Sequence, residues 1–184
     1  MFISFTGAQS TGKSTLLQEC KKLDLKVKYV DEVTRFIKRK YKVPINEHAG
    51  DTTQILIINQ HVINSLMKKN VIMDRCIIDG LVYTYWLYEK GKVSKWVLDY
   101  AKNVYDMLIS KIDVIFYCQP DFDLVDDGER STDVIFRDEI IMLMDIVTST
   151  CKPEQLVKLS GTVEQRMETI INTLNKHGIT TTRQ

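Results

Sequence analysis

Apolar residues in this chain follow two patterns in turn: short continuous runs of strand length, and longer stripes with three- or four-residue spacing. Each short run predicts a β-strand, and each stripe predicts a helix that buries one face. Strands that alternate with helices predict a parallel sheet joined by right-handed crossovers. The runs that predict strands are Met1 to Thr6, Lys26 to Val30, Asn70 to Arg75, Asp113 to Cys118 and Gln155 to Leu159.

Helical stripes fill most of the remaining chain. The predicted helices run from Ser14 to about Leu23, from Val33 to Lys42, from Asp51 to Leu66, in two or three pieces from Cys76 to Lys111, from about Phe136 to Thr148, and from Val163 to Leu174. Gln119 to Asp138 is the one long irregular segment, and such segments inside compact domains are usually functional or disordered. The class predicted is α/β, as one domain over residues 1–184.

The turn after the first strand matches the phosphate-binding pattern G-x-x-x-x-G-K-[ST] from Gly7 to Ser14. Glycines at both ends allow positive φ angles, so backbone N–H groups and the start of the next helix can surround an anion. Lys13 would reach the β- and γ-phosphates, and the Ser14 hydroxyl would be a magnesium ligand. The residues predicted to bind the nucleotide are Gly7, Ser10, Thr11, Gly12, Lys13, Ser14 and Thr15.

Composition narrows the classes of partner. The 184 residues carry a net charge of +1, which gives no overall attraction to nucleic acid or to a membrane surface. No apolar run approaches the ~18 residues that a membrane span requires, and no signal sequence precedes the first strand. The four cysteines are widely spaced, so we expect reduced, buried thiols and a cytoplasmic protein.

Charged residues follow the predicted strands at their carboxyl ends. Asp31 and Glu32 come after the second strand, and Asp74 and Arg75 end the third. Carboxyl ends of parallel strands meet at one edge of the sheet, so these groups and the phosphate loop should share a crevice. We expect the other notable polar groups to lie at the surface. The basic run Lys38, Arg39, Lys40 and Lys42 should form a solvated helix face, and His48 and His61 should lie in a loop and on a helix surface.

With these features together, the sequence resembles those of small phosphotransferases of the P-loop kinase superfamily. The similarity is strongest to the ribosylnicotinamide kinase domain of the bifunctional bacterial NAD-biosynthesis regulator and its AAA-type, often phage-encoded relatives. It covers nearly the whole chain and rests on Gly7 to Thr15, Glu32-x-x-Arg35, Asp74 and the block from Asp126 to Ser131. The resemblance implies a three-layer fold with a five-stranded parallel sheet, helices on both faces, and a lid over about residues 120–139.

The resemblance also implies roles for individual residues. Glu32 or its neighbour Asp31 would act on the acceptor hydroxyl, with Arg35 beside it, and Asp74 would hold magnesium together with Ser14. Arg130 and Arg137 would belong to the lid and neutralise charge on the transferred phosphoryl group. Gly161 and Thr162 would lie beneath the adenine. The implied activity uses ATP and Mg²⁺ to phosphorylate a nucleoside or nucleotide.

Because of Arg75, the sequence does not decide which compound accepts the phosphoryl group. An Asp-Arg pair at this position is typical of thymidylate and deoxynucleoside kinases, and Arg75 would then bind a phosphate already on the acceptor. The alternatives are therefore a deoxynucleoside monophosphate kinase or a polynucleotide 5′-kinase, with a small-molecule acceptor favoured over a nucleic-acid end. A hypothesis from a different class is a nucleotide-hydrolysing switch or motor ATPase. The Walker-B context and the N-K-x-D signature that a switch would carry are absent from the sequence. Oligomeric state stays open, a homo-oligomer included.

Overall fold

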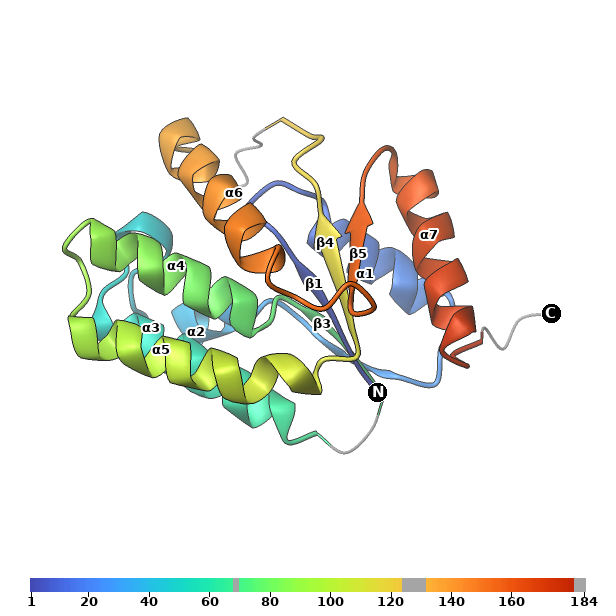
Figure 1. Cartoon of the computed structure of the whole chain (residues 1–184), viewed down its shortest axis with the longest axis horizontal. Coiled ribbons are helices and arrows are strands. Elements are labelled where there is room, and N and C mark those ends of the chain that lie inside the picture. The colour runs from blue at the N-terminus through green and yellow to red at the C-terminus, as the bar shows by residue number, and fades with distance from the viewer. Residues whose placement is uncertain (68–69, 124–131, 181–184) are drawn as a thin grey trace.

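A parallel sheet forms the centre of the molecule (Figure 1). The computed structural model describes residues 1–67, 70–123 and 132–180. Within these ranges the five strands lie in the order β2-β3-β1-β4-β5, and every neighbouring pair is parallel. Their bounds are β1 Phe2–Thr6, β2 Lys28–Val30, β3 Val71–Asp74, β4 Val114–Cys118 and β5 Leu156–Leu159. All carboxyl ends therefore share one edge, as the sequence predicted.

Helices cover both faces of the sheet. Their bounds are α1 Lys13–Lys22, α2 Val33–Tyr41, α3 Asp51–Ser65, α4 Ile77–Glu89, α5 Lys95–Leu108, α6 Val134–Thr148 and α7 Val163–Lys176, with short 3-10 turns at Asn46–His48 and Ile109–Lys111. One face carries α1 and α7, and the other carries α3, α4, α5 and α6 (Figure 1). The predicted three-layer α/β architecture is confirmed.

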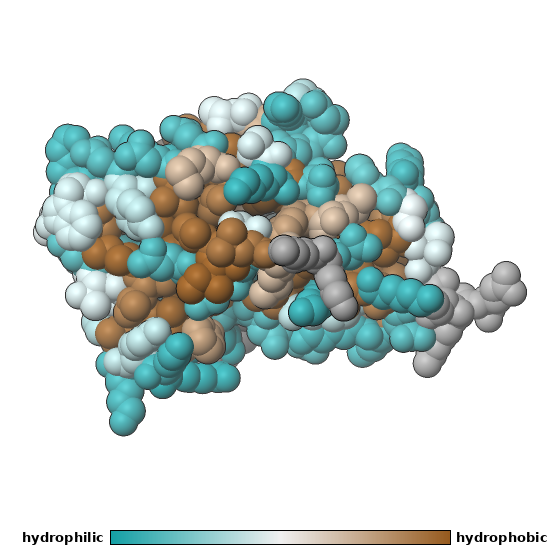
Figure 2. All heavy atoms as spheres, turned by 90° about the horizontal axis from the view of Figure 1, so that it is seen from below, coloured by the Kyte–Doolittle hydropathy of each residue, from teal (hydrophilic) through white to brown (hydrophobic). Residues whose placement is uncertain are grey.

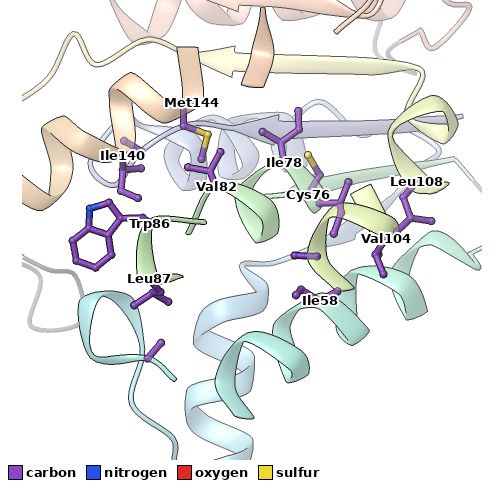
Figure 3. Close-up of a cluster of buried hydrophobic side chains, with 14 of the residues drawn as sticks. Ile58, Cys76, Ile78, Val82, Trp86, Leu87, Val104, Leu108, Ile140 and Met144 are labelled. Carbon is purple, nitrogen blue, oxygen red and sulfur yellow. The ribbon is translucent and has the colours of Figure 1, made fainter. Parts of the chain in front are cut away.

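The larger apolar core lies between the sheet and the second helical layer. Side chains from α3, α4, α5 and α6 meet there, among them Ile58, Val82, Val104 and Met144 (Figure 3). The Trp86 indole packs edge-on against the Phe136 ring at a centroid distance of 4.5 Å. Burying such side chains contributes about 1.5–3 kcal/mol each, so this core holds the helical layer against the sheet.

Two elements begin two residues away from their predicted starts. Strand β2 begins at Lys28 because a tight turn precedes it, in which the Val27 amide donates to the Leu25 carbonyl at 2.8 Å. Helix α6 begins at Val134, two residues before the predicted start, because the Asp133 carboxylate accepts from the Phe136 amide at 3.0 Å and caps the helix.

The prediction that His61 lies on a helix surface is wrong. Only 4% of His61 is exposed, and its ring packs on α4, where a Cβ at Gly80 would lie 3.4 Å from the histidine Cδ2 atom. Burial lowers the pKa of His61 to about 4. His61 is therefore a neutral core residue that depends on the glycine opposite it.

The cysteines agree with the expectation of free, mostly buried thiols. All four cysteines are free, and three of them are buried. No helix within the described ranges is both long and apolar enough to cross a bilayer. Apolar side chains gather on the lower face of the molecule (Figure 2). The exposed large apolar residues include Ile63 and Leu66 near the end of α3 and Met107 near the end of α5.

Candidate active site

The phosphate loop takes the backbone form that its glycines predict. Gly7 has φ +140° and Gly12 has φ +84°, and Ser10 between them also has a positive φ of 57°. A Cβ at Gly7 would lie only 2.8 Å from the Cys118 carbonyl oxygen, so strand β4 leaves no room for a side chain there. The loop is thus held closely against the sheet, and α1 starts directly after it.

Lys13 lies inside this loop and is only 5% exposed. Its ammonium donates to the Ala8 carbonyl and, at 3.1 Å, to the Thr11 hydroxyl. Burial, and next the charge of Arg75, lower the pKa of Lys13 to about 8. Since the ammonium is poorly solvated, an anion in the loop would interact with it more strongly than in water.

Ser14 and Asp74 form the second element of the site. The Ser14 hydroxyl donates to Asp74 Oδ2 at 2.6 Å, and Asp74 is 2% exposed at the end of β3. Among the described residues, the buried Asp74 Oδ1 has no hydrogen-bond partner. Burial, followed by the nearby charge of Glu32, raises the pKa of Asp74. A hydroxyl beside a carboxylate with a spare oxygen is the donor set that Mg²⁺ uses at nucleotide sites, so these residues fit the predicted ion.

Glu32 lies between two guanidinium groups. Arg75 Nε donates to its Oε1 atom at 2.9 Å, and Arg35 Nε donates to Oε2 at 3.0 Å. Burial alone would favour the protonated acid, but the charges of Arg75, Lys13 and Arg35 outweigh burial and lower the pKa of Glu32. Glu32 is therefore an ionised carboxylate held in one orientation.

Arg75 connects this carboxylate to the base of the phosphate loop. Its Nη1 atom donates to Asp79 Oδ1 at 2.7 Å, and the other Asp79 oxygen accepts from the Thr6 hydroxyl and the Cys76 amide. Arg75 has a φ of +77°, and its guanidinium carbon lies 5.3 Å from the centre of the Tyr83 ring. Such a conformation persists only where the surroundings fix it, as these bonds do. Arg75 thus positions Glu32 relative to the loop.

A cavity of about 760 Å³ opens beside Glu32, Ser14 and Asp74. Residues of α1, α2 and α3 and the end of β2 line it. This volume is within the range of small-molecule sites. A second hollow, between Gln54, His61 and Tyr83, measures only about 20 Å³, which is the space of roughly one water molecule.

A buried arginine of α7 also supports the phosphate loop. Arg166 on α7 is fully buried and donates to three backbone carbonyls, those of Thr11 at 2.7 Å, Gln119 at 3.0 Å and Gly161 at 3.0 Å. Its Nη2 atom also pairs with Asp121 at 3.0 Å. Gly161 and Thr162 were predicted to lie beneath the adenine. The Gly161 carbonyl is one of these three acceptors, and Thr162 caps α7.

Phe122 joins α6 to the same region. Its ring stacks on the Arg166 guanidinium at 4.6 Å, and a Cβ at Gly12 would lie 3.3 Å from the ring. Arg137 on α6 donates to the Phe122 carbonyl. Arg137 is therefore connected to the phosphate loop through Phe122, while Arg130 and the whole block from Asp126 to Ser131 lie outside the described residues.

The structure brings most of the predicted residues together. Lys13, Ser14, Glu32, Asp74 and Arg75 converge at the carboxyl edge of β1, β2 and β3. Two others lie outside this buried group. Thr15 is exposed on α1, and Asp31 lines the cavity, but its carboxylate is 74% exposed and pairs with Lys21 at 2.7 Å. Between the two neighbouring acids, the geometry favours Glu32.

Sequence reasoning missed Asp79 and Arg166. Asp79 had a usable signal, since it is the third residue of α4 and its carboxylate caps the Cys76 amide. Arg166 had none, because an arginine in an amphipathic helix is ordinarily a surface residue.

Comparison with known proteins finds structures of similar fold. The search of curated proteins gives no match. Among solved structures, NadR in complex with NR superposes with a TM-score of 0.73 at 19% identity, over 99% of this chain and 53% of that one. A deoxyadenosine kinase from M. mycoides gives 0.71 at 17% identity, over 96% of this chain and 100% of that one. Thymidylate kinase from Candida albicans gives 0.63 at 16% identity, over 96% and 92%.

These likenesses concern the fold alone. The chain spans about half the length of the NadR chain. The family model described as "AAA domain" matches residues 2–166. This chain therefore belongs to the AAA domain family, and its fold is similar to those of the three structures named above.

Proposed function

We propose that this chain is an ATP- and Mg²⁺-dependent kinase that phosphorylates a hydroxyl group of a nucleoside or nucleotide. One observation carries the proposal. The ionised Glu32 carboxylate, fixed by Arg75 and Arg35, lines a cavity of about 760 Å³ that also reaches Ser14 and Asp74. A hydrolysing switch needs no such second-substrate cavity beside its phosphate loop.

The chain's own residues divide the reaction between them. Glu32 accepts the proton of the acceptor hydroxyl as the oxygen–phosphorus bond forms and the bond to the departing ADP breaks. Lys13 and the backbone N–H groups of the loop hold the phosphates of the donor. Ser14 and Asp74 would hold Mg²⁺, which supplies neutralising charge to the phosphates when bound.

Arg75 favours a hydroxyl acceptor over a phosphate acceptor. Its Nε and Nη1 donors are already used by Glu32 and Asp79. An arginine committed in this way positions the acid that acts on a hydroxyl. A phosphate acceptor, as in a nucleoside monophosphate kinase, would have to bind the remaining N–H groups of a guanidinium whose charge is already balanced by two carboxylates.

The test is acceptor-dependent release of ADP by the purified chain with MgATP. Acceptors should include nicotinamide riboside, nucleosides, deoxynucleoside monophosphates and 5′-hydroxyl oligonucleotides. We expect slow ADP release alone, rapid release with an accepted hydroxyl compound, and no release by a Lys13→Met variant. Equal turnover with and without every acceptor would instead support the switch or motor class.

A further inference from the structure

The cavity beside Glu32 has a basic wall that the catalytic proposal leaves unexplained. Arg35, Phe36, Arg39 and Lys40 all line it from α2. These positions share one face of the helix, since residues four apart lie one turn apart. Arg39 and Lys40 are exposed, as the predicted solvated basic face requires, and they also line the cavity, whereas Lys38 and Lys42 do not.

Charges in the cavity are separated along its length. Glu32 and Asp74 lie at the strand ends, where transfer would occur. Arg35 pairs with Glu32, and Arg39 lies one helical turn, ~5.4 Å, further along α2. Lys40 follows, with its ammonium 5.3 Å from the centre of the Phe36 ring and 5.1 Å from that of Tyr41. The cavity therefore changes from an acidic end to a basic end.

Two amide side chains of α3, Gln60 and Asn64, also line the cavity. Asn64 on α3 is 3% exposed, and its Oδ1 atom accepts from Gln60 Nε2 at 2.9 Å. Its buried Nδ2 atom has no hydrogen-bond partner among the described residues. A buried amide donor without a partner costs about 1–3 kcal/mol, so a ligand carbonyl or ring nitrogen would stabilise it.

We propose that the acceptor is itself a phosphorylated compound: a nucleotide with a free primary hydroxyl at Glu32 and a phosphate at Arg39 and Lys40. The inference rests on the proposed kinase function and names its substrate class. The phosphate would lie at least one helical turn from Glu32, so it is a recognition group and not the group that receives the phosphoryl. Two sources share this chemistry, a nucleoside 3′-monophosphate and the 5′-hydroxyl end of an oligonucleotide.

The experiment compares kcat/KM for three acceptors with the same base: the nucleoside, its 3′-monophosphate, and a 5′-hydroxyl dinucleotide. We expect the phosphorylated acceptors to exceed the nucleoside by at least about tenfold, the effect of one charge-assisted hydrogen bond. Arg39→Gln combined with Lys40→Gln should abolish most of that advantage, so that the kcat/KM of the phosphorylated acceptors approaches that of the nucleoside. Preference for the dinucleotide over the monophosphate identifies a nucleic-acid end, and the reverse preference identifies a free nucleotide.

A matched control removes the same charge from the same helix. Lys38→Gln combined with Lys42→Asn should keep the preference, because neither residue lines the cavity, and asparagine tolerates the left-handed backbone of Lys42. Equal kcat/KM for nucleoside and phosphorylated acceptors would overturn the inference while the kinase function stands. An equal loss in the control and cavity variants would also overturn it. Absence of transfer to every acceptor would refute both.

Discussion

Glu32→Gln is the most informative single substitution, because it removes a charge and leaves the shape. The carboxylate accepts two charged hydrogen bonds, from Arg75 and Arg35. Glutamine keeps one oxygen acceptor but turns an NH₂ group toward the other guanidinium. One bond is lost and the other weakened, which from ~1.5–3 kcal/mol per charged bond gives about 3 kcal/mol of lost stability. In a chain of this size, that lowers Tm by roughly 6–12 °C.

The catalytic effect should be larger than the effect on stability. General-base catalysis contributes about 10²–10⁴-fold, so we expect kcat to fall by at least 10²-fold while ATP still binds. The assay is steady-state ADP release with a saturating acceptor, below the Tm of the variant, together with ATP titration and thermal denaturation.

Asp31→Asn is the control for this prediction, because Asp31 is the adjacent acid but is 74% exposed. It should change stability by no more than ~0.5 kcal/mol and leave kcat unchanged. Full activity of Glu32→Gln with a large loss in Asp31→Asn would show that the neighbouring acid acts on the acceptor and that our assignment is wrong.

Three further predictions concern groups around the site. Arg75→Lys cannot bridge Glu32 and Asp79 together, so kcat should fall for every acceptor; a rise in acceptor KM confined to phosphorylated acceptors would show instead that Arg75 binds the acceptor phosphate. Arg166→Met leaves three backbone carbonyls without a donor and should cost about 4 kcal/mol and raise the KM for ATP, whereas an unchanged Tm in thermal denaturation would contradict the bracing role. The folded pKa of His61, about 4, lies below its unfolded value, so folding should lose about 3 kcal/mol as pH falls from 6.5 to 4, and urea titrations of His61→Leu should lack that loss.

The sequence predicted the sheet and the donor side of the site because both depend on local patterns. Gly7, Gly12 and Lys13 act through backbone conformation and through position at the end of a strand, which spacing alone reveals. The carboxyl-edge rule then placed Glu32 and Asp74 beside the loop before their contacts were known.

Contacts between distant segments could not be predicted in the same way. Arg166 reaches the carbonyl of Thr11, which is 155 positions away in the chain, and only the packing of α7 beside α1 makes that bond. The sequence could not decide between Asp31 and Glu32 either, because the two acids are adjacent and only the structure shows that Glu32 is the one that pairs with Arg75. His61 was misjudged because its burial depends on Gly80 of another helix.

The central claim is that this chain transfers a phosphoryl group to an acceptor hydroxyl held at Glu32. The most direct measurement follows the label of γ-³²P-ATP in single turnover, with and without the best acceptor. We predict that label appears on the acceptor in a 1:1 ratio with ADP, as expected for direct transfer, and that Glu32→Gln slows its appearance. Label that appears as inorganic phosphate at the same rate with or without acceptor would contradict the account.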